Sequence, residues 1–204
     1  WRPFIIFLLP LLLTNILQSL SGTINTVFVG QLLGVQAIAA VSVFAPILFF
    51  LLAFIIGIAS GSSILIGQAW GAKDYDLIKR ITGNSFAIIL IMGAVIAVLG
   101  SLLSRFIIVQ MGVPADIETM ATDYARLMLM GSPLLFLFIA YTSLLRGVGD
   151  SVTPLLAVGI SIVIGLVVTP ALIKGWFGLP QFGIAAPAIA TLLSQFLVLL
   201  YLYI

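Results

Sequence analysis

The side chains able to do chemistry in this sequence are few, and most of them are neutral. The 204 residues include no histidine and no cysteine, and the carboxylates number six: Asp74, Asp76, Asp116, Glu118, Asp123 and Asp150. Zinc hydrolysis, haem ligation, Cys–His nucleophiles and disulfide scaffolds therefore lack their reagents. We expect no catalytic residue, no metal site and no cofactor.

Polar but uncharged side chains recur along the first apolar segment at helical spacing. Asn15, Gln18, Gly22 and Asn25 follow one another at intervals that place them on one helix face, opposite a face of leucine, isoleucine and valine. Such amides serve either as hydrogen-bonding contacts between helices or as the lining of a central cavity. The second interpretation predicts five cavity-lining residues on the first and last apolar segments: Asn15, Gln18, Asn25, Thr191 and Gln195. Asn84 and Ser85 on the third apolar segment are further polar residues that we expect in the interior.

The segment Leu144–Pro154 is the most structured polar stretch and spells Gly-Val-Gly-Asp at its centre. We interpret it as a structural loop in which Asp150 favours the start of the next helix and pairs with Arg146. The residues assigned to this loop motif are Arg146, Gly147, Gly149, Asp150 and Pro154.

The same Gly-x-Gly-Asp pattern is also the signature of intramembrane aspartyl proteases. That chemistry needs a second aspartate close enough to share a proton with Asp150. Asp123 lies about 40 Å of helix away along the chain, and Asp76 lies in a charged, solvated run. We therefore expect a protein that is not an enzyme.

The composition requires these side chains to be positioned by membrane helices. Hydrophobic residues make up 63% of the chain and charged residues 7%, against about 25% charged in soluble domains. A soluble globular domain is excluded, and the weak, dispersed charge excludes nucleic acid as a partner. The predicted fold is an all-α polytopic membrane protein with six transmembrane helices, at about 4–29, 37–66, 81–103, 121–144, 154–173 and 184–204.

Prolines and small residues indicate how these spans bend and pack. Prolines at positions 10, 46, 133, 170 and 187 predict bent helices around a cavity. Ala53, Gly57 and Gly61 permit a close helix approach. Asp123 and Arg126 are spaced to form an ion pair.

The basic residues indicate orientation in the lipid bilayer. If the N-terminus is cytoplasmic, that side collects Arg2, Lys73, Lys79, Arg80 and Arg146, and the other side collects Arg105, Arg126 and Lys174. This excess predicts a cytoplasmic N-terminus. The first residue is Trp1 and the last span stops at Ile204 without a polar flank, so we expect a piece of a longer chain.

Three segments together resemble the N-terminal half of the multidrug and toxic compound extrusion (MATE) family. They are Val29–Val41, Gly67–Asp74 and Leu145–Pro154, in that order within six spans. The resemblance implies that residues 1–204 form one lobe of a two-lobe transporter whose C-terminal lobe is absent from this chain. It also implies export of organic, often cationic amphiphilic small molecules across a bacterial inner (plasma) membrane, by alternating access and antiport against H⁺ or Na⁺.

The chain departs from the resemblance at the positions that bind the coupling ion in some family members. Many relatives carry an aspartate where this chain has Asn25, and an asparagine and an aspartate where it has Gly165 and Thr169. Asn25 cannot titrate, so either the coupling site lies in the other lobe or this protein uses neutral oxygens. A carrier resembling lipid-linked oligosaccharide flippases remains the alternative, although its phosphate cargo calls for more cationic residues in the spans.

Overall fold

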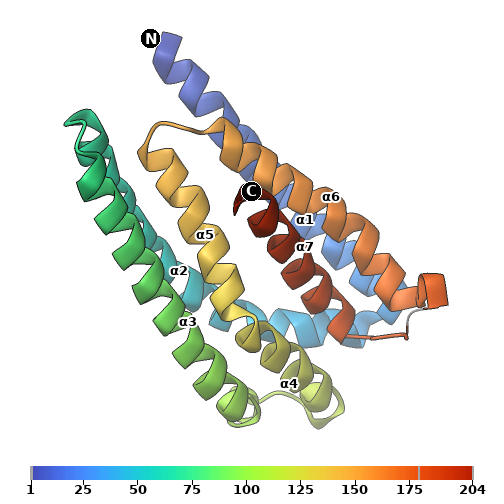
Figure 1. Cartoon of the computed structure of the whole chain (residues 1–204). Coiled ribbons are helices and arrows are strands. Elements are labelled where there is room, and N and C mark those ends of the chain that lie inside the picture. Colours follow the sequence, from blue (N-terminus) through green and yellow to red (C-terminus); the bar gives the residue numbers. More distant parts are fainter. Residues whose placement is uncertain (1, 179, 204) are drawn as a thin grey trace.

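Every regular element that the structure describes is a helix (Figure 1). The computed structural model describes residues 2–178 and 180–203, so Ile204, the predicted end of the last span, lies outside it, as does the side chain of Arg2. The helices are α1 (Arg2–Leu33), α2 (Val35–Gly71), α3 (Tyr75–Gln110), α4 (Ala115–Met130), α5 (Ser132–Gly147), α6 (Val152–Lys174) and α7 (Ala185–Tyr203), with a short 3-10 turn η1 (Trp176–Gly178) before α7.

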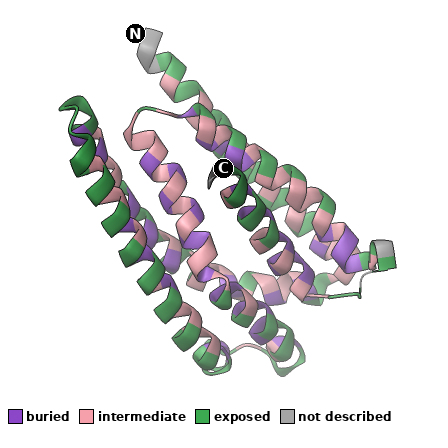
Figure 2. Cartoon of the chain, viewed as in Figure 1, coloured by how far each residue is buried: buried purple, intermediate pink, exposed green. Residues whose placement is uncertain are grey.

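The outer surface of the helix bundle is apolar, as expected of a protein surrounded by lipid. Large side chains such as Phe50, Leu102 and Tyr201 are exposed, and α3 presents an almost continuous exposed face (Figure 2). Five of the helices are long and apolar enough to cross a membrane, and the α4–α5 pair forms a sixth span if counted as one. In hydrocarbon, a helix is favoured because it satisfies its backbone hydrogen bonds internally.

The fourth predicted span, 121–144, is bent, as Pro133 indicated, but it is not one continuous helix. The chain there forms two helices, α4 and α5, bent by 51° relative to each other. The break falls at Gly131, and Pro133 lies in the first turn of α5, where its missing N–H costs no helical hydrogen bond. Hydropathy did not reveal the complete break, because the two helices together are apolar enough for a single span.

The helices pack in two groups, which meet where α1 contacts α2, α4 contacts α7, and α5 contacts α6 and α7. In the first, α5 packs on α2 and α3, and α4 packs on the same two helices. Phe44, Ile55, Ile89 and Phe136 are buried at the centre of this group. In the second, α6 packs on both α1 and α7. Phe138 of α5 joins a buried cluster with α6 and α7, and so connects the groups.

Close helix contacts occur at glycines other than those predicted. A Cβ at Gly57 or Gly61 would meet nothing within 4 Å, so the small residues of α2 do not form the expected contact within the described chain. Instead, a Cβ on Gly93 of α3 would lie 2.7 Å from the Cα of Pro133. A Cβ on Gly147 would lie 2.6 Å from the backbone oxygen of Ser63, so α5 and α2 nearly touch there.

The turns separate the basic residues into two groups at opposite ends of the bundle. Lys73 lies in the α2–α3 turn and Arg146 near the α5–α6 turn, and both turns lie at the same end as the start of α1 (Figure 1). Lys174 ends α6 at the opposite end, where the α3–α4 turn also lies. The basic residues that the sequence assigned to opposite sides of the membrane therefore lie at opposite ends of the bundle.

Candidate functional site

Three adjoining pockets follow the polar face of α1 through the interior of the bundle. The first, of about 170 Å³, lies between α1, α6 and α7. The second, of about 200 Å³, extends toward α2 and α4 and shares Asn25 and Thr191 with the first. The third, of about 420 Å³, opens between α1, α2, α5 and α7 and shares Gln18, Phe138 and Gln195 with the first. Together the pockets form one extended, mostly neutral cavity.

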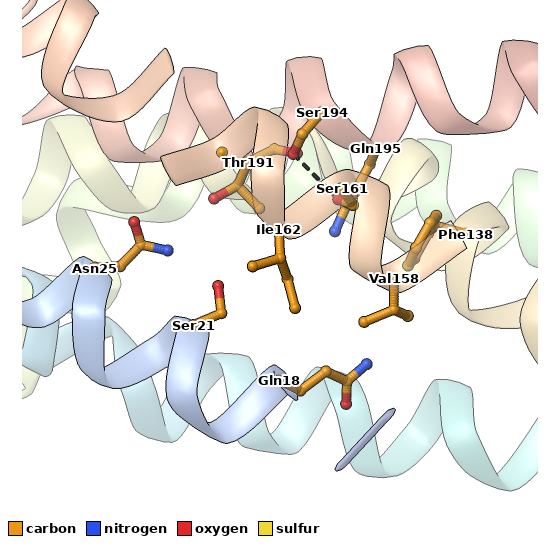
Figure 3. Close-up of a pocket in the computed structure, with 11 residues that line it drawn as sticks. Gln18, Ser21, Asn25, Phe138, Val158, Ser161, Ile162, Thr191, Ser194 and Gln195 are labelled. Atoms are coloured by element: carbon orange, nitrogen blue, oxygen red, sulfur yellow. Dashed lines mark hydrogen bonds between the residues drawn. The ribbon is translucent and has the colours of Figure 1, made fainter. Parts of the chain in front are cut away.

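The first pocket is lined by hydroxyl and amide groups from three helices (Figure 3). Gln18, Ser21 and Asn25 lie on α1 and face Thr191, Ser194 and Gln195 on α7 (Figure 3). On the α6 side, Ser161 Oγ lies 3.2 Å from Ser194 Oγ. Val158, Ile162 and Phe138 supply apolar surface. Such a mixture suits an organic molecule with scattered polar groups.

Asn25 lies at the junction of the first two pockets. Its Oδ1 accepts a hydrogen bond from Thr169 Oγ1 on α6 at 3.4 Å, and the side chain is half-buried. Thr169 stands one residue before Pro170, which lies inside α6. A proline at this position leaves a carbonyl without its usual helical donor. Asn25 therefore links α1 to a locally weakened part of α6.

All five residues predicted to line a cavity lie beside these pockets. Gln18, Asn25, Thr191 and Gln195 line the first pocket, and Asn15 lines the third. Asn15 and Gln18 are exposed rather than enclosed. The role of these residues in binding substrate remains a prediction.

Sequence reasoning missed two lining residues and misplaced one. Ser161 lies in the middle of the apolar α6, and Arg146 was expected only in the loop motif, but both line pockets. Their signal was present, because a polar residue in an apolar helix needs a partner or water. Conversely, Asn84, expected in the interior, is exposed. Its neighbour Ser85 is buried and bonds Ser62 of α2 at 2.8 Å.

Asp150 has the structural role predicted for the loop motif, but it does not form the predicted ion pair with Arg146. Asp150 Oδ1 accepts hydrogen bonds from the backbone N–H groups of Val152 and Thr153, both at 3.0 Å. Partial burial raises the pKa of this carboxyl, but the side-chain hydroxyl of Thr153 and these two backbone N–H groups together outweigh burial and hold the pKa below its ordinary value. Because the carboxylate is directed at the α6 backbone, no salt bridge with Arg146 forms among the described residues.

The other motif residues shape the same turn. Gly149 has a φ of 86°, a left-handed conformation that favours glycine. Pro154 is buried in the first turn of α6, where a proline is tolerated. Gly147 allows the close approach of α5 to α2.

The predicted pair between Asp123 and Arg126 is also wrong for the described chain. Arg126 Nε instead donates to the backbone oxygen of Ser101 on α3 at 3.4 Å. The ion pair that does form joins Arg105 of α3 to Glu118 of α4 at 3.3 Å. Spacing along one helix did not reveal these contacts, because both partners come from the packing of α3 against α4.

The fold and cavity define a multi-pass helical membrane protein with an internal polar pocket. Asp150 and Asp123 lie in the α5–α6 turn and in α4, at opposite ends of the bundle, so they do not form a protease dyad (Figure 1). The MatE family model matches residues 10–171. The chain belongs to the MatE family.

Similar proteins agree in both sequence and fold. The chain is 45% identical over 203 residues to the probable multidrug resistance protein YoeA of Bacillus subtilis strain 168, covering 98% of this chain and 44% of that protein. It is 28% identical to the probable multidrug resistance protein NorM of Thermotoga maritima, covering 92% and 40%. A crystal structure of MATE in the straight conformation superposes with a TM-score of 0.88 at 26% identity, covering 98% and 43%. The chain thus spans less than half the length of the relatives it matches.

Proposed function

We propose that the protein containing this chain is a secondary active exporter of organic compounds, and not an enzyme. The observation that carries the proposal is the extended cavity between α1, α5, α6 and α7, lined by neutral polar groups inside a bundle with an apolar exterior. A polar cavity at membrane depth is costly unless it serves a passing solute. Membership in the MatE family and the multidrug resistance names of two relatives support this proposal.

We infer that residues 1–204 act as the N-terminal lobe and that a second, similar lobe completes the transporter. The match to less than half of each relative supports this division. The two lobes would expose the cavity alternately to each side of the membrane. The excess of basic residues near the α2–α3 and α5–α6 turns supports a cytoplasmic N-terminus in a bacterial plasma membrane.

The lining of the first two pockets suits cationic or neutral amphiphiles. Their polar groups are amides and hydroxyls, and Tyr124 is their one titratable side chain among the described residues. Amide and hydroxyl oxygens accept hydrogen bonds from ammonium groups, and the apolar lining covers hydrophobic rings. A flippase of lipid-linked oligosaccharides would need several cations, but Arg146 is the single cation beside the three pockets described above.

The same lining supports a coupling-ion site outside these two pockets. Asn25, Thr169 and Thr191 offer oxygens to Na⁺, but the lining includes no carboxylate to take up a proton or to hold Na⁺ strongly. We propose antiport against H⁺ or Na⁺ with the principal coupling site in the second lobe.

The experiment is dye transport by the full-length protein in proteoliposomes, driven in turn by a proton gradient and by a Na⁺ gradient. We expect at least one gradient to drive a cationic amphiphilic dye against its concentration difference. The control is the same vesicle with an ionophore that collapses the gradient. Dye movement unaffected by either gradient, across a panel of cationic dyes, would contradict secondary active transport.

A further inference from the structure

We propose that the third pocket, between α1, α2, α5 and α7, is a binding site for an acidic group of an amphiphilic substrate, a carboxylate or phosphate held by Arg146. This inference rests on the proposed transport function and adds a substrate class to it. Substrates would carry a negative group at the Arg146 end and a neutral or cationic part among the amides of the first pocket.

The first observation is that Arg146 is a cation without a counter-ion. It lines the third pocket, and its Nε is buried with no hydrogen-bond partner among the described residues. The described residues also place no carboxylate in a salt bridge with it. A half-buried charge left unpaired is unfavourable, so an incoming anion would gain both a charge interaction and hydrogen bonds.

Two groups that could neutralise Arg146 within the chain do so only in part. The Asp150 carboxylate is engaged with the first backbone N–H groups of α6. Arg146 lies in the last turn of α5, where the helix dipole favours a positive charge. The dipole contributes roughly half an elementary charge at a helix end. The dipole accounts for tolerance of the cation, but it supplies no acceptor to the buried Nε–H of Arg146.

The second observation is that the chain holds Arg146 in a fixed place. One turn earlier, Ser143 Oγ donates to the Ala59 backbone oxygen of α2 at 3.2 Å, and both residues line the third pocket. The next residue, Gly147, packs against Ser63 so tightly that no Cβ would fit. The backbone that carries Arg146 is therefore held in place, and its guanidinium can bind a planar acidic group through two parallel hydrogen bonds.

The third observation is that the pocket offers further hydrogen-bonding groups and enough room. Asn15, Gln18 and Gln195 line it, and Gln195 Oε1 is buried without a partner among the described residues. Its volume of about 420 Å³ lies within the range of small-molecule sites. Because Gln18, Phe138 and Gln195 also line the first pocket, one molecule can occupy both.

The test compares two dyes that share a rhodamine cation and differ at one position. Rhodamine 110 carries a carboxylate there, and rhodamine 123 carries its methyl ester. Binding to the full-length protein, in nanodiscs of phosphatidylcholine, is measured by fluorescence anisotropy. The variants are Arg146→Gln and Arg146→Lys, and the matched control is Arg80→Gln. Arg80 is an exposed arginine in the first turns of α3, at the same end of the bundle.

We expect Arg146→Gln to weaken binding of the carboxylate dye about tenfold or more, since a lost hydrogen bond to a charged group has that effect. Binding of the ester should change less than about twofold by the same reasoning, and Arg146→Lys should restore part of the affinity. Arg80→Gln should leave both dyes unaffected. An equal loss for both dyes, or no loss for either, would overturn the inference and leave the proposed transport function standing. Failure of the wild-type protein to bind either dye would overturn both.

A second arm identifies the source of the acidic group. Nanodiscs containing phosphatidylglycerol present a competing lipid phosphate to the same cation. If the site takes the acidic group of a solute, added phosphatidylglycerol leaves the affinity of wild-type protein for the carboxylate dye within about twofold. A larger loss that disappears in Arg146→Gln would assign the pocket to lipid headgroups and overturn the substrate assignment.

Discussion

At the scale of single residues, the polar face that α1 contributes to the pockets is built from groups that do not titrate. The polar lining of α1 is limited to amides and hydroxyls, and the cation beside it is an arginine, which stays charged at every accessible pH. The α1 face therefore supplies no titrating group, and Tyr124 is the titratable side chain among the described residues that line the second pocket. The carboxylate closest in sequence to Arg146, Asp150, has a structural role instead.

We predict that Asp150→Ala destabilises the start of α6. The variant removes the acceptor for the N–H groups of Val152 and Thr153, a loss of about 0.5–1 kcal/mol, taken at the low end because the site is only partly buried. Asp150→Asn keeps a side-chain oxygen and should recover most of the stability. The measurement is the thermal unfolding midpoint in detergent. A midpoint equal to that of the wild type would contradict this capping role.

The pH dependence of this effect has a definite sign. The pKa of Asp150 is lowered in the folded protein, so the stabilisation is fully present above the ordinary carboxyl pKa. It is lost only as the pH falls through the folded-state pKa. The difference between Asp150→Ala and wild type should therefore stay constant from about pH 5 to about pH 8. A difference that disappears within that range would show that the carboxylate is not held in its charged form.

The sequence predicted which helix face the polar residues share better than it predicted the partners of the charged residues. The spacing of Asn15, Gln18 and Asn25 was enough to place them on one face, because a helix has a fixed period. The partners of Arg146, Arg126 and Arg105 were not predictable, because each depends on how two distant helices meet. Local spacing suggested the nearest carboxylate as the partner of Arg126 and of Arg146. In the fold, Arg126 bonds a backbone oxygen of α3 and Arg105 pairs with a carboxylate of α4. Arg146 Nε has no partner among the described residues.

At the scale of the elements, the bend between α4 and α5 organises the first helix group. Ser132 Oγ donates to the Gly93 backbone oxygen at 3.1 Å, and Pro133 packs directly on Gly93. The contact joins α3 to the beginning of α5, next to the 51° bend. It depends on the absence of a side chain at Gly93.

We predict that Gly93→Ala disrupts this junction. The new Cβ would lie 2.7 Å from the Pro133 Cα, a backbone atom that has no room to move, so we expect a loss of about 1–3 kcal/mol. The matched control is Gly61→Ala on α2, whose Cβ would meet nothing within 4 Å and should be neutral or slightly stabilising. Thermal unfolding midpoints in detergent compare the two. Equal midpoints for both variants would contradict the close contact between α3 and α5.

Sequence reasoning predicted the number of membrane crossings, and Pro133 indicated a bend in the fourth. Long apolar runs are a strong signal, and the five long helices correspond to five of the six predicted spans. The complete break at Gly131 was not predicted, because hydropathy averages over the two short helices. The expected contact at Gly57 and Gly61 was wrong because a row of small residues does not reveal which helix, if any, approaches it.

At the scale of the whole molecule, the chain presents a lined cavity within a lobe that covers less than half of its relatives. The helices around the cavity belong to two packed groups, and α1 and α5 each contact the other group. A change in the position of α1 relative to α6 would alter the first pocket, because the hydrogen bond from Thr169 to Asn25 joins the two helices beside it. Substrate binding and movement of this lobe would then be linked through α1.

We infer that the polar face of α1 lines the transport pathway, and efflux by two leucine variants tests this inference. Asn25→Leu changes a residue between the first two pockets, and Thr23→Leu makes a similar change two residues away, outside these pockets. In proteoliposomes of the full-length protein at equal insertion, we predict that Asn25→Leu lowers efflux of a cationic dye about tenfold, the effect of losing roughly 1.4 kcal/mol of interaction. Thr23→Leu should transport normally. Wild-type efflux by Asn25→Leu, or equal losses in both variants, would contradict the account.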